Sequence, residues 1–424
     1  MVAPKVPEKP MKYPALLLAL CLAVPGFVQA KVIGTTVPAQ PLTAEQITTL
    51  PEEQRAPWTQ YLAQSQNQMK LDQAILAAER TDLTEIVYGK NGDGTKTMPL
   101  NRDAAWYGSA EARHIADVIV SYQTPAGGWG KNAPRDGAVR QWGESWIAGK
   151  EEGWHYVGTF DNGATTTEIQ FLARVQAQIP DEAGNRYRAA IYGGLNYIFN
   201  SQYPNGGWPQ VWPLEGGYHD AVTFNDNALS DIAGVLRLVA AGQGDYAFLP
   251  QSIRAQATAA LDRAIGVILS SQVRIESQPT AWGQQHDTLN LMPVGARNFE
   301  PASLSSSESA ALLLELMKVE NPSDAVVASV HAGAAWLKSK AMTGVAWVKA
   351  GNDKALVQDA NAKPLWARYY SLETGEPIFG DRDLTIHDDV MEISAERRNG
   401  YAWYGTSAQK ALDVYAEWSQ KHPQ

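Results

Sequence analysis

Two short stretches of the chain place an acid beside an amide in nearly the same setting. Residues 159–162 read TFDN and residues 223–226 read TFND, and both precede an apolar-periodic segment. Asp220 lies just before the second stretch. Carboxylate and amide oxygens are the ligands that hard cations such as Ca²⁺ prefer. The candidates for a calcium site are therefore Asp161, Asn162, Asp220, Asn225 and Asp226.

Helix capping is the ordinary alternative for these side chains. The short oxygens of Asp and Asn accept unpaired amide protons in the first turn of a helix. A helix N-terminus favours an anion, but a second carboxylate nearby is unfavourable unless the two share a cation. We therefore expect Asp161 to be both a cap and a metal ligand.

A later polar region carries the other candidates for chemistry. The segment 282–300 contains His286, Arg297 and Glu300 and precedes the third of the predicted inner helices. A lone His is more often structural than catalytic, and Arg297 could form an ordinary ion pair with Glu300. Charge is also dense at 381–383 and 394–401, where we expect Glu396, Arg397 and Arg398 to form a structural network.

The elements that must position these residues are predicted to be helices, because apolar residues recur at helical spacing. We predict helices over 110–122, 163–179, 186–201, 226–241, 253–271, 305–319, 325–340 and 403–417. Similar Gln-and-Trp loops occur at 123–129 and 202–208, with a looser form at 272–282. Repeated helix pairs bury their apolar faces against their neighbours. The sequence thus predicts a mainly α fold, an (α/α)3-like toroid of three helical hairpins. Irregular loops and short strands over 345–383 should form walls of its cleft.

The N-terminal region differs from this regular pattern. Lys5, Lys9 and Lys12 precede an apolar run and a small-residue cleavage pattern ending at Ala30. This pattern predicts a signal peptide over 1–30, cleaved after Ala30, and hence a secreted or periplasmic protein. Residues 31–100 are expected to form a helical or irregular extension, with Pro51 and Pro57 as breaks, before a catalytic toroid over 101–424.

Composition narrows the possible partners. The net charge of −10 argues against nucleic acid, and the single cysteine, Cys21, falls inside the predicted signal. We expect no membrane partner after signal removal, and a monomer. The chain has 14 Trp and 17 Tyr against 8 Phe, an excess of amphipathic aromatics that suits a carbohydrate cleft or a packed core.

Several motifs together resemble one known family, over about 105–420. They are GGWGKN at 127–132, TFDNGATTTEIQFLARV at 159–175, YPNGGWPQVWPLEGGYHDAVTFNDNA at 203–228, GAR at 295–297, PIFGDRD at 377–383 and EISAERRNGYAWYG at 392–405. This set resembles the polysaccharide lyase family 10 pectate lyases. The resemblance implies an (α/α)3 toroid and calcium-assisted β-elimination of polygalacturonate to 4,5-unsaturated oligogalacturonates.

The resemblance also assigns roles to residues. It implies Ca²⁺ bound by Asp161, Asn162 and Asp226, with Asp220 left open as the alternative second carboxylate, and Arg297 as the catalytic base. The residues expected to contact substrate are Lys131, Arg382, Arg368, His286, Trp208 and Tyr218. Arginine is an awkward base because guanidinium hardly deprotonates in proteins, and a tight pair with Glu300 would oppose the role.

Three other functions remain open from the sequence. An α/α-toroid glycoside hydrolase acting on a plant cell-wall polysaccharide would use two of Asp161, Asp220 and Asp226 as acid and base. An isoprenoid cyclase or transferase also uses Gln- and Trp-bearing loops on such toroids, although the export signal argues against it. A non-catalytic carbohydrate-binding module would need neither a metal nor Arg297.

Overall fold

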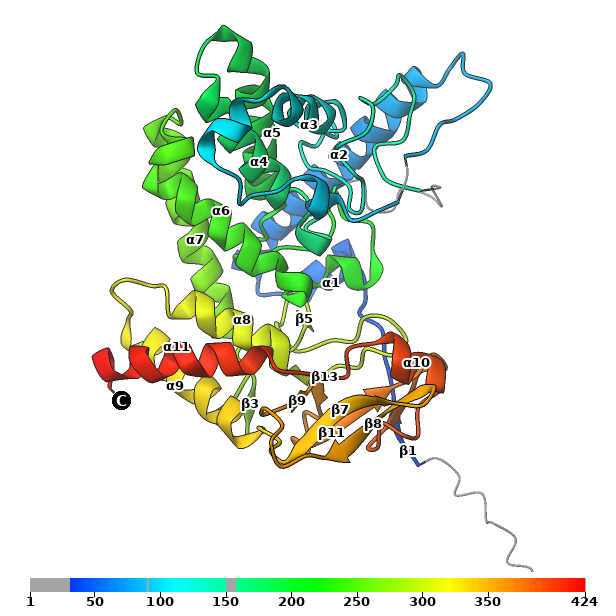
Figure 1. Ribbon diagram of the computed structural model, residues 1–424, viewed down its shortest axis with the longest axis vertical. Helices are drawn as coiled ribbons and strands as arrows, with labels where there is room; N and C mark the ends of the chain where they lie inside the picture. The colour runs from blue at the N-terminus through cyan, green and yellow to red at the C-terminus, as the bar shows by residue number, and fades with distance from the viewer. Residues whose placement is uncertain (1–30, 90, 150–157, 424) are drawn as a thin grey trace, which may run out of the picture.

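The chain folds mainly into helices, with short strands gathered at one end (Figure 1). The structure, a computed structural model, describes residues 31–89, 91–149 and 158–423. The predicted signal peptide over 1–30, with Cys21 and the cleavage site after Ala30, lies outside the described residues. Within the described part of the chain, no helix is both long enough and apolar enough to cross a membrane.

Three antiparallel helical hairpins form the body of the molecule, as predicted. They pair α4 with α5, α6 with α7 and α8 with α9, while α3 precedes the first and α11 packs on the last. In Figure 1 they follow one another from the upper to the lower part of the molecule. The bounds are α3 Ala110–Ser121, α4 Thr166–Gln178, α5 Asn185–Ser201, α6 Ala228–Ala241, α7 Gln251–Ser271, α8 Ser306–Leu316, α9 Asp324–Ser339 and α11 Ser407–Lys421. The α/α toroid is confirmed as the fold.

The predicted loop repeat has a clear physical basis. In the segments that follow α3, α5, α7 and α9, a buried Trp donates its indole N–H to a carbonyl near the end of the preceding helix. In the first three of these segments a Gln amide also donates to a carbonyl of the next outer helix. The Trp bonds run from Trp129 to Ile119, Trp208 to Ile198, Trp282 to Ile268 and Trp366 to Leu337. The Gln bonds run from Gln123 to Ala190, Gln202 to Ala260 and Gln272 to Ser329. These loops therefore join successive outer helices to one another, and the repeat is structural.

Short strands lie mostly at one end of the molecule, in the lower part of Figure 1. A five-stranded sheet has the order β1-β12-β11-β10-β6, and each of its neighbouring strand pairs is antiparallel. The other strands form two-stranded pairs, the longest being β7 with β8. The bounds are β1 Val32–Thr35, β2 Val222–Thr223, β3 Arg274–Ile275, β4 Gln278–Pro279, β5 Gln285–His286, β6 Leu304–Ser305, β7 Val345–Ala350, β8 Asp353–Gln358, β9 Trp366–Ala367, β10 Tyr369–Tyr370, β11 Pro377–Gly380, β12 Thr385–His387 and β13 Tyr404–Gly405. The predicted strands within 345–383 are thus present.

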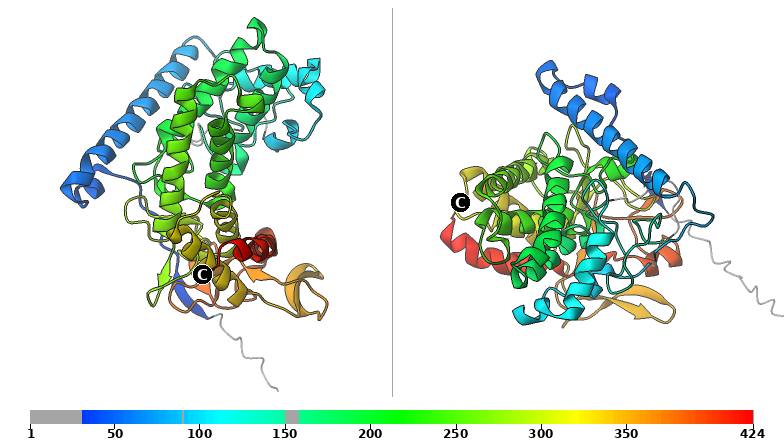
Figure 2. Two further views of the ribbon diagram at one scale, coloured as in Figure 1. Left: turned by 90° about the vertical axis from the view of Figure 1, so that its left-hand side faces the viewer. Right: turned by 90° about the horizontal axis from the view of Figure 1, so that it is seen from above.

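The N-terminal extension runs along the toroid. Its helices are α1 Ala44–Thr48 and α2 Glu52–Glu79, and α2 lies beside the stacked hairpins in both views of Figure 2. Pro51 stands at the N-cap of α2, so the predicted break there is confirmed. Pro57 lies inside α2, so the predicted break there is wrong. At the sixth position of α2 the proline removes a single backbone hydrogen bond, and the helix continues through it.

The remaining helical pieces are short. Helix α10 spans Ala395–Gly400 and carries the dense Arg–Glu cluster. One-turn 3₁₀ segments lie at Gly94–Thr97, Ala104–Gly108, Asp161–Gly163, Glu182–Gly184, Gly217–Asp220, Asn225–Asn227 and Gly244–Tyr246. Two of these, at 161–163 and 225–227, contain the predicted calcium ligands and contact each other directly.

Candidate active site

The two repeated stretches form matching one-turn segments at the entrances to α4 and α6. Asn162 and Asp226 occupy equivalent positions with φ of 53° and 50°. Such left-handed backbone is costly for most residues, but Asn and Asp tolerate it best. The left-handed position therefore accepts either side chain, which explains why it holds Asn in the first stretch and Asp in the second. The capping prediction is wrong, because α4 begins after Thr165 and α6 after Asn227, and neither Asp161 nor Asp226 is an N-cap.

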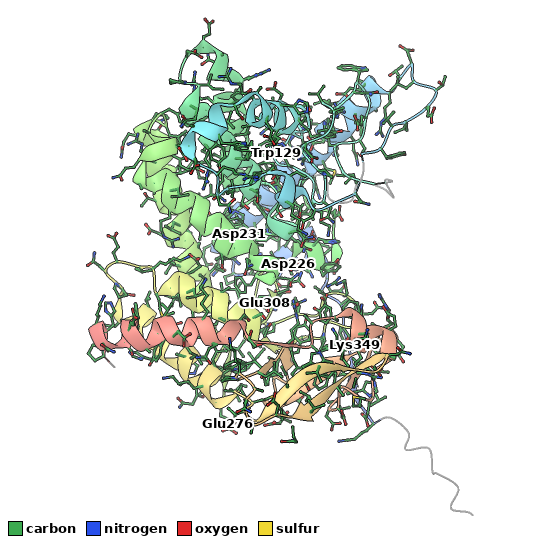
Figure 3. All side chains as sticks on the ribbon, in the orientation of Figure 1. Trp129, Asp226, Asp231, Glu276, Glu308 and Lys349 are labelled. Atoms are coloured by element: carbon green, nitrogen blue, oxygen red, sulfur yellow. The ribbon has the colours of Figure 1, made fainter. Side chains whose placement is uncertain are left out.

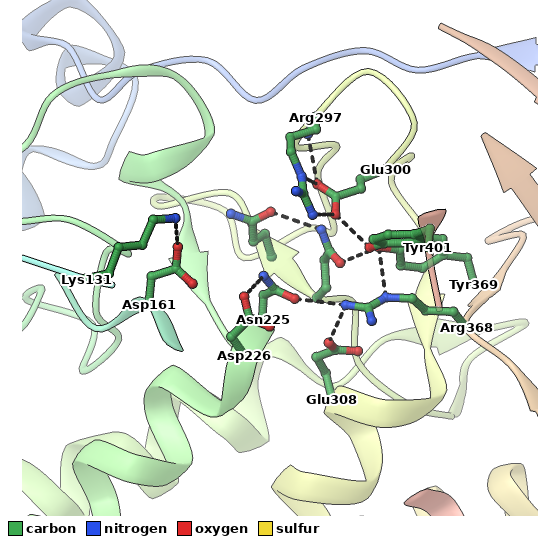
Figure 4. Close-up of polar contacts among 12 residues, drawn as sticks. Lys131, Asp161, Asn225, Asp226, Arg297, Glu300, Glu308, Arg368, Tyr369 and Tyr401 are labelled. Atoms are coloured by element: carbon green, nitrogen blue, oxygen red, sulfur yellow. Dashed lines mark hydrogen bonds and ion pairs between the residues drawn. The ribbon is translucent and has the colours of Figure 1, made fainter. Parts of the chain in front are cut away.

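Asp161 and Asp226 face one space, as the repeat predicted. Loss of hydration within the surrounding protein, together with the like charge of Asp161, raises the pKa of Asp226 to about 7. Lys131, another predicted site residue, bonds the carboxylate of Asp161 (Figure 4). Asn162 is exposed and donates to the side-chain oxygen of Asn132 at 3.2 Å. The structure therefore brings Asp161, Asp226 and Lys131 together.

Asp220 has a different role from Asp226. Its carboxylate is buried and accepts the backbone amides of Leu42 at 3.0 Å and Gly216 at 2.9 Å. Burial raises the pKa of Asp220 to about 6. Because both oxygens are occupied by backbone donors away from Asp161, we assign Asp220 to holding loops together. Asp226 is the better candidate for the second metal-binding carboxylate.

A third acid, which the sequence reasoning missed, lies opposite this pair. Glu308, in the first turn of α8, bonds Arg368 at 3.1 Å, and Arg368 also donates to the side-chain oxygen of Asn225 at 3.0 Å (Figure 4). Figure 3 places Asp226 and Glu308 near each other in the middle of the molecule. Arg368 is therefore held in the site, and its contact with substrate stays a prediction. The pattern Ser305-x-x-Glu308, typical of a capping box, is the sequence signal that could have identified this acid.

Arg297 lies on the other wall of the site in a tight pair with Glu300. Its Nε donates to Glu300 Oε2 at 2.8 Å, its Nη2 bonds Oε1, and its backbone N–H reaches Oε2 at 3.1 Å. The bonds with Glu300 raise the pKa of Arg297 well above its usual value. In this arrangement Arg297 is a fixed cation, and the pair opposes its predicted role as a base.

Glu300 does not depend on Arg297 alone for hydrogen bonds. The hydroxyl of Tyr401 donates to Glu300 Oε1 at 2.7 Å, and Tyr401 in turn lies 2.6 Å from the hydroxyl of Tyr369. Although burial alone would raise it, the bond with Arg297 lowers the pKa of Glu300. The carboxylate of Glu300 would thus keep two donors, Tyr401 and the backbone of Arg297, if the guanidinium moved away.

Aromatic rings gather the arginines into a cationic wall. The guanidinium carbons of Arg297, Arg382 and Arg397 lie 4.8, 5.3 and 4.3 Å from the centre of the Phe299 ring. Arg368 lies 4.9 Å from the ring of Tyr401. Cations over aromatic faces are attracted by the ring quadrupole, which offsets part of their mutual repulsion. The site therefore sets paired carboxylates opposite a group of arginines.

Arg382 has the most exposed side chain of this wall, at 59% against 49% for Arg297. It pairs with Glu396 through contacts of 3.1 and 3.0 Å, and its backbone oxygen accepts from Asn298 at 2.9 Å. Exposed pairs of this kind contribute little to stability and open easily. The guanidinium of Arg382 is therefore accessible from solvent, and its contact with substrate stays a prediction.

Two predicted substrate residues are structural instead. Trp208 has none of its surface exposed, because its ring packs in the core and its N–H bonds Ile198. His286 is equally buried; it accepts the amide of Gly283 at 2.9 Å and donates to the carbonyl of Leu291 at 2.7 Å. Burial lowers the pKa of His286 to about 4, so the ring is neutral. Tyr218 is half-buried against His219, and its predicted role stays a prediction.

A cavity continues the site on the side of Asn162. It measures about 370 Å³ and is lined by Asn132, Asn162 and Glu168 together with residues 92–95 and Met98 of the N-terminal extension. The segment 92–98 is joined to the toroid by the bond from the Gly92 amide to the Asn132 carbonyl at 2.7 Å. The extension thus contributes to the surroundings of the site.

The donor set at Asp161 and Asp226 fits Ca²⁺ by its chemistry. Calcium takes carboxylate, amide and carbonyl oxygens, and two acids this close favour a shared cation, as the raised pKa of Asp226 indicates. Across residues 31–89, 91–149 and 158–423, no group of three or more His, Cys, Asp or Glu side chains is placed to hold a metal ion. Any ion here must therefore complete its shell with amide oxygens, water or ligand.

The fold and the site already define a class of protein. A helical toroid with acids on one wall and clustered arginines on the other is suited to binding an anionic polymer. The model of the pectic acid lyase family matches residues 123–412. Two solved structures of a family 10 polysaccharide lyase from Cellvibrio cellulosa are similar at 32% identity and a TM-score of 0.64.

These structural matches extend over nearly all of the Cellvibrio chain. They cover 78% and 77% of this chain and 99% and 97% of the other, and the first is an alanine variant in complex with trigalacturonic acid. No curated protein matches the chain. The chain belongs to the pectic acid lyase family and is a polysaccharide lyase of the pectate lyase type.

Proposed function

We propose that the protein cleaves polygalacturonate by calcium-assisted β-elimination, releasing 4,5-unsaturated oligogalacturonates. The observation that carries the proposal is the opposition of the Asp161–Asp226 pair to the arginine wall in a chain of the pectic acid lyase family. Polygalacturonate presents a carboxylate on every sugar, so such a site can hold one carboxylate by a cation and its neighbours by guanidinium groups.

Asp161, Asn162 and Asp226 would hold the Ca²⁺. When bound, the ion would neutralise a substrate carboxylate and make the adjacent C5 proton more acidic. Lys131, which bonds Asp161 in the structure, would then turn to the substrate. Arg368, fixed by Glu308 and Asn225, has little freedom and would orient the sugar through its remaining donors.

Elimination also requires a base at C5, and we propose Arg297 for this role after it separates from Glu300. The separation is supported by the Tyr401 hydroxyl and the Arg297 backbone amide, which continue to satisfy the Glu300 carboxylate. Once freed, Arg297 stands beside Arg382 over the Phe299 ring. Neighbouring cations disfavour its charged form, which moves it toward the neutral guanidine that could accept a proton.

Ultraviolet absorbance of the unsaturated product tests the proposal. Polygalacturonate incubated with the protein and Ca²⁺ should give a rise in absorbance that chelator abolishes and added Ca²⁺ restores. The competing function, a glycoside hydrolase using paired Asp residues, predicts chain cleavage without this absorbance and with chelator present. Cleavage of that kind would refute the lyase mechanism.

We also propose that the protein acts outside the cytoplasm as a monomer. The basic start, apolar run and small residue at Ala30 support export, and a long polysaccharide substrate is found outside cells. N-terminal sequencing of the secreted protein should begin at Lys31. Retention of residues 1–30 on the active protein would contradict the proposed signal peptide.

A further inference from the structure

A segment of the N-terminal extension touches three loops of the site. We name residues 36–42 the strap; they follow β1 and precede α1. The strap lies outside the residues that the family model matches, 123–412. It contacts the turn that carries Arg382, the loop that carries Arg297 and the loop that carries Tyr218.

The first contact fixes the turn of Arg382. Strand β1 pairs with β12, and the amide of Thr36 then donates to the carbonyl of Leu384 at 2.8 Å. The same turn is closed by the bond from the Asp381 amide to the Thr385 carbonyl at 2.9 Å. Because Leu384 adopts φ of 74°, a conformation that a bulky residue takes only under constraint, the strap helps to hold this turn.

The second contact fixes the loop of Arg297. The amide of Ala39 donates to the carbonyl of Gly295 at 3.0 Å, and Val37 lies so close that a Cβ on Gly295 would meet its carbonyl oxygen at 2.5 Å. Two residues later, Arg297 enters a turn closed by the bond from Ala296 to Glu300 at 2.9 Å. The backbone just before Arg297 therefore rests directly on the strap.

The third contact involves the buried Asp220. One carboxylate oxygen accepts the amide of Leu42 at the end of the strap, and the other accepts the amide of Gly216. Asp220 thus ties the strap to the loop 216–220. A buried carboxylate that accepts two backbone amides is strongly bound, because each bond is assisted by its charge.

We propose that the strap is a positioning element of the active site, which sets the spacing between Arg297 and Arg382. The inference rests on the proposed function, in which Arg297 is the base and Arg382 binds the substrate. Loops of this kind open locally at low cost unless they are tied to a rigid element, and β1 in the sheet supplies that anchor. A displacement of about 1 Å at reacting groups can reduce a rate on the order of a hundredfold.

The test compares two glycine variants of the full chain. In Gly295→Ala the new methyl group collides with the Val37 carbonyl of the strap at 2.5 Å and lies 3.2 Å from the Glu300 carbonyl, whereas Gly266→Ala, in α7, has nothing within 4 Å of its Cβ. We expect Gly295→Ala to lose roughly tenfold or more in kcat/KM on polygalacturonate, with its far-ultraviolet circular dichroism and Tm close to those of Gly266→Ala. A folded Gly295→Ala with the full rate would overturn the proposal.

A double-variant comparison separates positioning from general damage. Once Arg382 is removed, the spacing between it and Arg297 can no longer affect the rate. The fall in kcat/KM caused by Gly295→Ala should therefore be smaller in an Arg382→Ala background. An equal loss in both backgrounds would contradict positioning. If Gly295→Ala fails to fold, Asp220→Asn takes its place, because its side-chain amide cannot accept from both Leu42 and Gly216. Its kcat/KM should then fall, and the fall should be smaller in the Arg382→Ala background. A wild-type protein without lyase activity would instead refute the proposed function.

Discussion

Replacing Glu300 by Gln tests whether Arg297 is the base. In the structure the carboxylate of Glu300 holds the guanidinium by a bond of 2.8 Å to Nε and a second bond to Nη2. Gln keeps the size of the side chain but removes its charge. The bonds that hold the charged form of Arg297 therefore weaken, and its pKa should fall toward its usual value.

The size of this change follows from Coulomb's law. Opposite unit charges about 4 Å apart near a protein surface interact by about 4 kcal/mol. The side chain of Arg297 is 49% exposed, so solvent screening reduces this to roughly 2 kcal/mol. Each 1.4 kcal/mol corresponds to about one pH unit. If neutral Arg297 takes the proton, the alkaline rise of kcat/KM should move to lower pH by roughly one to two units.

The assay is the initial rate of unsaturated product formation against pH at saturating Ca²⁺. Glu396→Gln is the matched control, because it removes the carboxylate partner of Arg382 in the same manner. We expect the rise of kcat/KM to shift in Glu300→Gln and to stay in place in Glu396→Gln. A rise that does not move in Glu300→Gln, or that moves equally in both variants, would show that Arg297 is not the base.

Three further predictions follow from the site and the core. Asp226→Asn should raise the Ca²⁺ concentration needed for half-maximal rate at least roughly tenfold, since it removes one of two metal-binding carboxylates; an unchanged calcium titration would exclude Asp226 as a ligand. Trp208→Phe should lower the free energy of unfolding by about 1–3 kcal/mol, because the Ile198 carbonyl loses its donor, and should leave KM unchanged; a raised KM with full stability in urea would restore Trp208 to the substrate site. The folded-state pKa of His286, about 4, lies below its unfolded value, so its contribution to stability is present above about pH 6.5 and is lost as pH falls toward 4; urea midpoints should show this loss in the wild type and a smaller one in His286→Gln.

Sequence reasoning predicted the helices well, because each buries an apolar face whose period is visible in the chain. The predicted helix over 110–122 differs from α3, Ala110–Ser121, by one residue. The metal half of the site was also accessible, since Asp161 and Asp226 lie in a visible repeat. The repeat misled us on capping, because the left-handed residues Asn162 and Asp226 force one more turn of chain before each helix begins.

Other features depend on contacts between distant parts of the chain. Arg368, between strands β9 and β10, bonds Glu308 in α8 and Asn225 in a 3₁₀ segment, and no local pattern shows that pairing. An aromatic residue beside a polar loop suits a sugar platform or a core equally well, and only the fold shows that Trp208 is buried. The pair between Arg297 and Glu300 was foreseen as a possibility, but its tightness required the geometry.

The central claim is that the glycosidic bond breaks by elimination, and solvent labelling tests it most directly. Polygalacturonate is cleaved in water labelled with heavy oxygen, with Ca²⁺ present, and the fragments are weighed by mass spectrometry. Elimination adds no water, so we predict unsaturated fragments that carry no label from the cleavage step. Fragments heavier by one labelled water, with saturated ends, would contradict the account and favour hydrolysis by the paired acids.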